Sequence, residues 1–173
     1  DLIPQFDYIR KAVKAFNLPS IELEKYEADD LIATYKIQAK KEKIKLTSVS
    51  SDKDLMQLVD QDTYMLDTMK DKHIGVDEVK EKFGVPPEKF IDVQSLAGDS
   101  VDNVPGVPGI GIKPAAELIN QFGSLDELLK KAETIKQPKR RQALLDNKSN
   151  ALISRELVTL KNDVPVKETI NDF

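Results

Sequence analysis

The segment LAGDSVDNVPGVPGIGIKPAAELINQF, residues 96–122, decides the fold of the second half of this chain. Its middle part, residues 98–112, is rich in glycine, proline and aspartate, which predict a loop. Residues 113–122 have apolar side chains at helical spacing and end at Gly123, while the residues up to Ala97 belong to a preceding helix. The segment therefore predicts two helices joined by a glycine-rich loop.

The last part of this loop, Gly109-Ile110-Gly111, can bring backbone amides close to a ligand because glycine leaves the backbone open. A loop that leads into a helix N-terminus favours phosphate binding, and Lys113 would lie beside the phosphate. The pattern is similar to a helix-hairpin-helix element, which contacts the DNA backbone and not the bases. It is not a P-loop, because the Gly-Lys-Ser/Thr ending is missing. A stiff turn without a ligand is the alternative.

The rest of the chain divides into an α/β part and an all-helical part. Alternating apolar residues predict strands at 44–49, 63–66 and 72–74, and residues 21–23 indicate a short edge strand. Helical spacing predicts helices at 5–16, 27–42, 54–59, 76–83, 86–97, 113–122, 138–146 and 149–160, and a capping box at Ser124 and Glu127 opens another. We expect an α/β fold with a partial parallel sheet and flanking helices over residues 1–75, followed by a helical half over residues 76–173.

The composition excludes several kinds of site. The chain has 173 residues, of which 40% are apolar, so we expect a folded domain. There is no cysteine and only one histidine, His73, which excludes disulfides and leaves little material for a zinc site or a Ser-His-Asp triad. No signal peptide and no apolar run of about eighteen residues is present, so we expect a cytoplasmic location and no membrane span.

The charged residues are close to balanced, with a net charge of −4. An acidic centre with a basic rim would explain this value, and so would an ordinary acidic surface. A basic run lies near a helix start at Lys136, Lys139, Arg140 and Arg141. We interpret it as a solvated face, with contact to a DNA backbone as the alternative.

Three acidic segments lie where predicted elements begin or end: residues 27–30 (EADD), 51–54 (SDKD) and 98–103 (GDSVDN). The spacing puts carboxylates of the first segment on one helix face, those of the second on one side of an extended loop and those of the third together on a helical turn. Asp29 fits this spacing least well. Oxygen ligands without histidine or cysteine suit Mg²⁺ or Mn²⁺. Pooled carboxylates repel one another unless cations neutralise them, and two divalent ions about 4 Å apart would do so. The segments therefore predict a shared metal site.

Each acidic segment also has a purely structural interpretation. Acids in the first turn of a helix complement its dipole, which would account for residues 27–30. Asp52 could cap the helix that follows it, and Asp99 and Asp102 could be turn residues. The spacing alone leaves this alternative open.

Three stretches taken together carry a resemblance to a known family: YEADDLI at 26–32, SDKDLMQLV at 51–59 and LAGDSVDNVPGVPGIG at 96–111. Their order and spacing resemble the 5′→3′ exonuclease domain of bacterial DNA polymerase I, in the flap endonuclease superfamily. The resemblance covers nearly the whole chain. It implies an enzyme that hydrolyses DNA phosphodiesters near a 5′ end or flap with two divalent ions, as in primer removal and repair.

The resemblance also implies roles for single residues. The catalytic and metal-binding carboxylates would be Glu27, Asp29, Asp30, Asp52, Asp54, Asp99 and Asp102. A helix–three-turn–helix element at about 95–120 would grip double-stranded DNA and hold a potassium ion in its loop. The DNA contacts would be Lys53, Gly106, Gly109, Ile110, Gly111 and Lys113. A polymerase domain would follow in the same chain.

This sequence departs from the family pattern at its beginning. Family members have two further metal-binding aspartates and a helical arch, all upstream of the position of Asp1. We therefore expect a piece of a longer protein that binds DNA weakly and cleaves it poorly by itself. Ser50-Ser51 replaces the usual Thr-Gly, and Pro114 replaces a threonine, but neither change removes a ligand. A non-catalytic DNA-binding module with a vestigial acidic site is the alternative, and retention of all seven acids argues against it.

Overall fold

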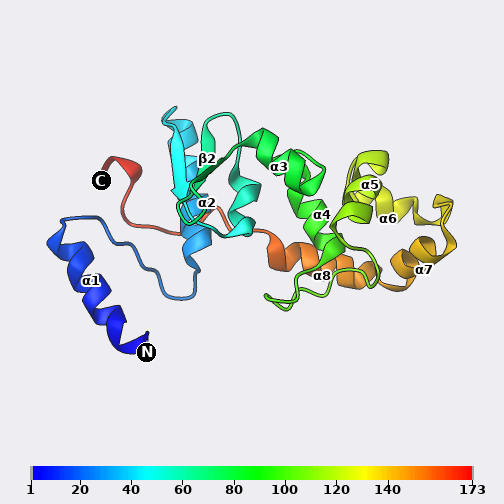
Figure 1. Cartoon of the computed structure of the whole chain (residues 1–173), viewed down its shortest axis with the longest axis horizontal. Helices are drawn as coiled ribbons and strands as arrows, with labels where there is room; N and C mark the ends of the chain where they lie inside the picture. The colour runs from blue at the N-terminus through cyan, green and yellow to red at the C-terminus, as the bar shows by residue number, and fades with distance from the viewer. Residues whose placement is uncertain (1, 173) are drawn as a thin grey trace.

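The structure is a computed structural model that describes residues 2–172. Figure 1 shows an α/β part, a helical part beside it and an N-terminal helix that lies apart from both. The N-terminal helix is α1 (Phe6–Ala15), and the first part contains α2 (Ala28–Lys41), β1 (Leu46–Val49), the 3-10 helix η2 (Lys53–Leu58), β2 (Thr63–Asp67) and β3 (Lys72–Ile74). The second contains α3 (Val76–Phe83), α4 (Phe90–Ala97), α5 (Ile112–Phe122), α6 (Leu125–Lys130), α7 (Pro138–Asp146) and α8 (Lys148–Val158). Short 3-10 turns lie at η1 (Ile3–Gln5), η3 (Pro87–Lys89), η4 (Ala132–Thr134) and η5 (Ile170–Asp172).

The sheet has the order β1-β2-β3. β1 pairs with β2 in parallel, with Leu46 opposite Thr63, and β3 pairs with β2 in the antiparallel sense, with Ile74 opposite Met65. The antiparallel strand follows from the short connection at residues 68–71, since a parallel pair needs a long crossover. The Asp67 carboxylate fixes this turn by accepting the amide hydrogens of the two residues at 69 and 70. The predicted α/β class is confirmed.

Three details differ from the sequence predictions. Residues 21–23 form no strand, because no described strand lies beside them to complete a ladder. The helix predicted at 54–59 is the 3-10 helix η2 over Lys53–Leu58, which Asp52 caps and which ends at Val59, where the backbone becomes extended. The helix predicted from residue 86 begins as the 3-10 turn η3 and becomes α-helical only at Phe90.

The buried core runs through both parts and is centred on α4. Phe90, Val93 and Leu96 of this helix have no exposed surface, and α4 packs against α5 and α8. The Phe90 ring meets Phe83 of α3 edge to face, with 4.7 Å between the ring centres. Because α4 is held on several sides, the loop that follows it starts from a rigid position.

A stripe of polar side chains on α2 holds the C-terminal segment. Asp30, Thr34 and Gln38 are spaced by four residues, so they share one face of the helix. Their oxygens accept backbone amide hydrogens from Lys161 at 2.8 Å, Val164 at 3.1 Å and Ile170 at 3.0 Å. The chain that leaves α8 therefore returns along α2, and both termini lie at the α/β end of the molecule (Figure 1). Across the described residues, no helix is both long and apolar enough to cross a membrane.

Candidate functional site

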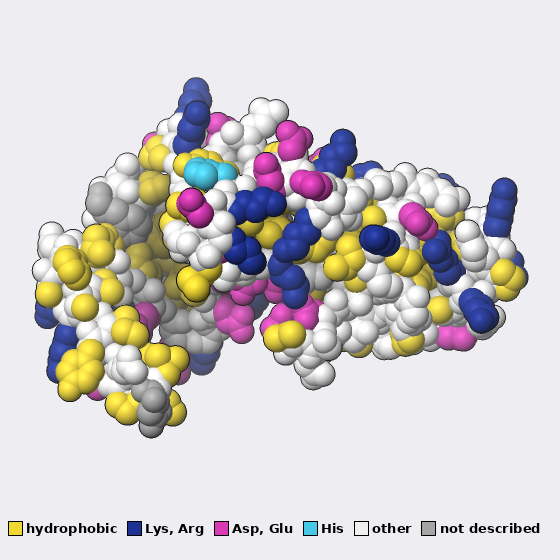
Figure 2. Space-filling view, in the orientation of Figure 1, with side chains coloured by type: hydrophobic (Ala, Val, Ile, Leu, Met, Phe, Trp, Pro, Cys, Tyr) yellow, Lys and Arg dark blue, Asp and Glu magenta, His cyan; other side chains and the backbone are white. Residues whose placement is uncertain are grey.

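The three acidic segments meet where the α/β part joins the helical part. Glu27, Asp29 and Asp30 lie at the start of α2, and Asp52 and Asp54 lie at the start of η2. Asp99 and Asp102 follow the end of α4. Figure 2 shows acidic side chains on both sides of the recess between the two parts, with lysine and arginine side chains directly above them.

The pKa values show that the first two segments face each other. Burial, followed by the negative charges of Asp52 and Asp54, raises the pKa of Asp29 to about 6. The pKa of Asp54 is also raised, chiefly by burial, and the charges of Asp52 and Asp102 act in the same direction. Carboxylates from all three segments therefore feel one another's charge, as a shared cation site requires.

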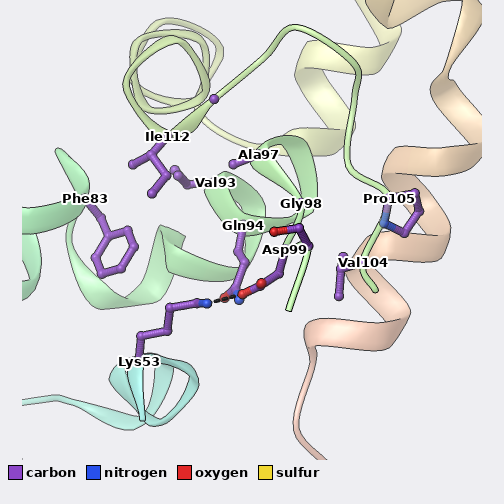
Figure 3. Close-up of a pocket in the computed structure, with 12 residues that line it drawn as sticks. Lys53, Phe83, Val93, Gln94, Ala97, Gly98, Asp99, Val104, Pro105 and Ile112 are labelled. Atoms are coloured by element: carbon purple, nitrogen blue, oxygen red, sulfur yellow. Dashed lines mark hydrogen bonds and ion pairs between the residues drawn. The ribbon is translucent and has the colours of Figure 1, made fainter. Parts of the chain in front are cut away.

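Lys53 connects the second acidic segment with the third. Its Nζ forms an ion pair with the Asp99 carboxylate, which is almost completely buried. This hydrogen bond is the main cause that lowers the pKa of Asp99, and the second Asp99 oxygen accepts the Val101 amide hydrogen at 2.8 Å. Figure 3 shows Lys53 reaching from η2 to Asp99, with Gln94 of α4 beside them. The ammonium group of Lys53 therefore neutralises part of the acidic centre.

The carboxylates are close, but they are not arranged around a common point. Within residues 2–172, no group of three or more Asp, Glu or His side chains is placed to hold one ion. Asp30 accepts amide hydrogens from Glu27, at 3.4 Å, and Lys161. Asp52 accepts the Asp54 amide hydrogen at 3.0 Å and caps η2, as its structural interpretation predicts. The fold thus brings the three segments together without completing a coordination sphere.

Gln94 is a polar residue of the centre that the sequence analysis missed. Its Nε2 donates to Asp54 Oδ1 at 2.7 Å, although it lies on the buried face of α4. Its Oε1 is buried and has no hydrogen-bond partner among the described residues. A glutamine among the apolar side chains of a buried helix face was a signal in the sequence, but only the fold shows which carboxylate it contacts.

The donor set fits divalent cations by its chemistry. All candidate ligands are carboxylate oxygens, which hard cations such as Mg²⁺ and Mn²⁺ prefer. Burial and neighbouring negative charges disfavour the charged forms of Asp29 and Asp54. A bound cation would stabilise these charged forms and relieve the repulsion between the carboxylates. The unpartnered Gln94 Oε1 adds a buried acceptor beside them. These residues could therefore hold metal ions after small side-chain movements.

The loop between α4 and α5 is folded around two glycines that touch. Gly98 and Gly106 both have positive φ, at +69° and +59°, and a Cβ atom on Gly106 would come within 2.5 Å of the Gly98 nitrogen. The Gly106 amide donates to Ser154 Oγ of α8 at 2.9 Å, and the Val107 amide donates to the Leu96 carbonyl at 2.8 Å. This part of the loop is therefore built by backbone contact and has little room for a ligand.

The predicted DNA contacts fall into two groups. Gly106 and the Ile110 side chain are buried, with Ile110 only 2% exposed, so they shape and anchor the loop. Gly109, Gly111 and Lys113 are exposed at the N-terminus of α5, and the glycines have open space on their side-chain faces. A hollow of about 570 Å³ lies between this end of the loop and Lys53. Gly111 and Asp99 both line it, so it connects the exposed end of the loop with the acidic centre.

Further lysines lie near Lys53 on the α3 side. The pKa of Lys82 is lowered, chiefly by burial and also by the positive charges of Lys70, Lys53 and Lys72. Four lysines therefore lie close together, and only Lys53 and Lys70 form ion pairs within the described part of the chain. These lysines form a basic rim beside the acidic centre, which is one of the two explanations given for the small net charge of the chain.

Comparison with known proteins identifies the family to which this chain belongs. A model described as "5′-3′ exonuclease, N-terminal resolvase-like domain" matches residues 1–84, and one described as "5′-3′ exonuclease, C-terminal SAM fold" matches residues 85–173. The chain therefore belongs to the 5′-3′ exonuclease family, and the resemblance is confirmed. The models assign α3 to the first part, whereas the predicted division at residue 75 assigns it to the second.

The relatives within this family include DNA polymerases. The chain is 59% identical to DNA polymerase I of Rhizobium leguminosarum over 96% of its length and 38% identical to that of Bacillus subtilis over 99%. It spans 16% and 20% of these proteins. It is also 36% identical to the 5′-3′ exonuclease of Buchnera aphidicola, of which it spans 60%.

Solved structures support the fold. The T5 5′-exonuclease, solved with bound divalent zinc ions, matches with a TM-score of 0.82 at 23% identity, covering 90% of this chain and 59% of that protein. The catalytic core of Rad2, solved with a DNA substrate, matches with a TM-score of 0.60 at 15% identity, covering 92% of this chain and 57% of that one. These likenesses confirm the two-part architecture.

Proposed function

We propose that this chain forms the DNA-gripping and carboxylate-bearing part of a 5′ nuclease, which hydrolyses DNA phosphodiesters near 5′ ends or flaps. The observation that carries the proposal is the meeting of three acidic segments next to an exposed glycine loop. Family membership supports it, since the three sequence relatives named above are two DNA polymerases I and a 5′-3′ exonuclease. The cofactors would be two Mg²⁺ or Mn²⁺ ions, and a potassium ion in the loop is part of the same proposal.

The metal ligands in this proposal are the seven carboxylates of the three segments. They are Glu27, Asp29, Asp30, Asp52, Asp54, Asp99 and Asp102. When bound, two such ions would activate a water and stabilise the leaving oxygen of the phosphodiester. The carboxylates would hold the ions, and Lys53 would keep Asp99 charged. The exposed end of the loop would place the DNA backbone next to the ions.

The proposed partner is double-stranded DNA with a 5′ end or flap. Its backbone would lie on the amides of Gly109 and Gly111 and on the side chain of Lys113, because a helix N-terminus attracts phosphate. Lys53 and the lysines on the α3 side would extend the contact past the acidic centre. A polymerase domain in the same protein also belongs to the proposal, given the length of the Rhizobium and Bacillus relatives.

Lys113→Ala is expected to weaken DNA binding and to reduce its dependence on salt. Loss of one phosphate contact should lower the slope of log K against log salt concentration by about one unit. Fluorescence anisotropy with a labelled duplex across a salt series measures this slope. Lys40→Ala is the matched control, because Lys40 is exposed near the C-terminal end of α2, and its slope should stay unchanged. An unchanged slope for Lys113→Ala, or strong dependence on base sequence, would contradict the proposed loop contact.

Cleavage separates the nuclease proposal from the alternative of a DNA-binding module. A labelled 5′-flap substrate is incubated with Mg²⁺ and either this chain or a version extended upstream to include the two further aspartates of the family. We expect the extended version to cleave at least about a hundredfold faster, because small misplacement of catalytic groups has costs of that size. DNA binding without cleavage by the extended version would support the module instead. Equal rates would show that the upstream ligands are dispensable.

A further inference from the structure

Gln94 combines two features that rarely occur together in a buried side chain. It is 6% exposed, and it lies on α4 between Val93 and Leu96, which have no exposed surface. One end of its amide is satisfied by Asp54, while the other end, Oε1, has no partner among the described residues. Buried polar groups are almost always hydrogen-bonded, because an unpaired one costs about 1–3 kcal/mol. The exception therefore needs an explanation.

The orientation of the amide is determined by its neighbour. A carboxylate only accepts hydrogen bonds, so the group that faces Asp54 Oδ1 must be Nε2 and the free atom must be the oxygen. Nearby Lys53 pairs with Asp99 and forms no hydrogen bond with this oxygen. The free atom is thus an acceptor without a donor, at the edge of an acidic centre.

The place of Gln94 connects it with the proposed chemistry. It lines the same hollow as Lys53 and Asp99, and Figure 3 shows its side chain directed toward that pair. Asp54 is one of the carboxylates whose charged form is disfavoured by burial. A donor at 2.7 Å limits the rotation of this carboxylate and leaves its second oxygen to bind a cation.

We propose that Gln94 is a positioning residue of the metal site, whose Nε2 orients Asp54 and whose Oε1 accepts a hydrogen bond from a water bound to the ion. The inference rests on the proposed metal site and adds a residue outside the seven carboxylates. Groups that hydrogen-bond to metal ligands commonly contribute about 10–100-fold to metal affinity.

The test compares two neighbouring residues of α4. Gln94→Met keeps the side-chain length and removes both polar atoms. Ser95→Ala is the control, because Ser95 is also buried but its hydroxyl donates to the Ile91 carbonyl of its own helix, at 2.6 Å. Isothermal titration with Mn²⁺ gives the affinity of each protein, and thermal unfolding without metal gives its stability.

We expect Gln94→Met to bind Mn²⁺ at least about tenfold more weakly than the wild type while its metal-free melting temperature is unchanged or higher. Ser95→Ala should bind Mn²⁺ like the wild type. Gln94→Glu should lower the metal-free melting temperature, since it places a carboxylate against Asp54, and Mn²⁺ should restore it.

Three results would overturn the inference. Equal Mn²⁺ affinity of Gln94→Met and the wild type would show that Oε1 meets only ordinary water, and the metal site itself would stand. A wild type that binds no Mn²⁺ would remove the metal site together with the role of Gln94. If Gln94→Met fails to fold, the NMR signal of the Gln94 side-chain amide in the wild type is followed as Mg²⁺ is added. Absence of any shift of this signal would contradict the proposal.

Discussion

Gly106→Ala is expected to lower the free energy of unfolding by about 3 kcal/mol or more, which makes it one of the two most damaging changes in this chain. A Cβ atom at this position would lie 2.5 Å from the nitrogen and 2.7 Å from the Cα atom of Gly98, and both are backbone atoms that cannot turn away. The positive φ of +59° adds strain for any other residue, of about 1–2 kcal/mol. Overpacking in a filled interior costs about 1–3 kcal/mol more.

The same loop supplies its own controls. Gly109 has a positive φ of +81° but open space around it, so Gly109→Ala should show the strain alone, at about 1 kcal/mol. Gly111 has an ordinary φ of −86° and open space, so Gly111→Ala should change stability by less than about 1 kcal/mol. Urea denaturation of the three variants measures their free energies of unfolding, and Gly106→Ala should show the largest decrease. A small effect of Gly106→Ala would mean that the contact between Gly98 and Gly106 can open.

The second large effect concerns the acidic centre. The double variant Asp29→Asn/Asp54→Asn is expected to abolish the stabilisation that divalent metal gives to the wild type. For an ion at a hundred times its dissociation constant, that stabilisation is about 2.7 kcal/mol. Both carboxylates are disfavoured in their charged forms by burial and by neighbouring charge, so their replacement removes metal affinity and relieves repulsion together.

The measurement is thermal unfolding with and without Mn²⁺. Without metal, the melting temperature of the double variant should equal or exceed that of the wild type. Added Mn²⁺ should raise the melting temperature of the wild type only. Asp62→Asn/Asp77→Asn is the matched control, because both residues are exposed acids outside the three segments and the net charge changes equally. A double variant that still gains the full Mn²⁺ stabilisation would place the metal site elsewhere.

Much of the architecture follows from local sequence. α2, α3, α5, α7 and α8 lie within a residue or two of their predicted ranges, since helical spacing, caps and breaking residues act over a few positions. Gly84 ends α3 in the left-handed conformation, and Ser124 caps α6, as their positions predict. The motifs of residues 26–32, 51–59 and 96–111 were enough to recognise the family, and comparison confirms it.

Tertiary structure decided what those residues do within the site. Lys53 and Asp99 are 46 residues apart, and Asp30 and Lys161 are 131 apart, so no local pattern could pair them. Ile110 and Gly106 have the sequence pattern of exposed members of a phosphate-binding loop, but both are buried, and Gly106 contacts Ala97 at the end of α4 and Ser154 of α8.

The chain by itself thus determined its element order, its acidic segments and its family, because these depend on residue type and short spacing. The fold alone decided that residues 21–23 stay outside the sheet and that Gln94 meets Asp54. Each of these depends on which distant residues come within a few ångströms after the core closes, and side-chain contacts of that kind leave no periodic signal in the sequence.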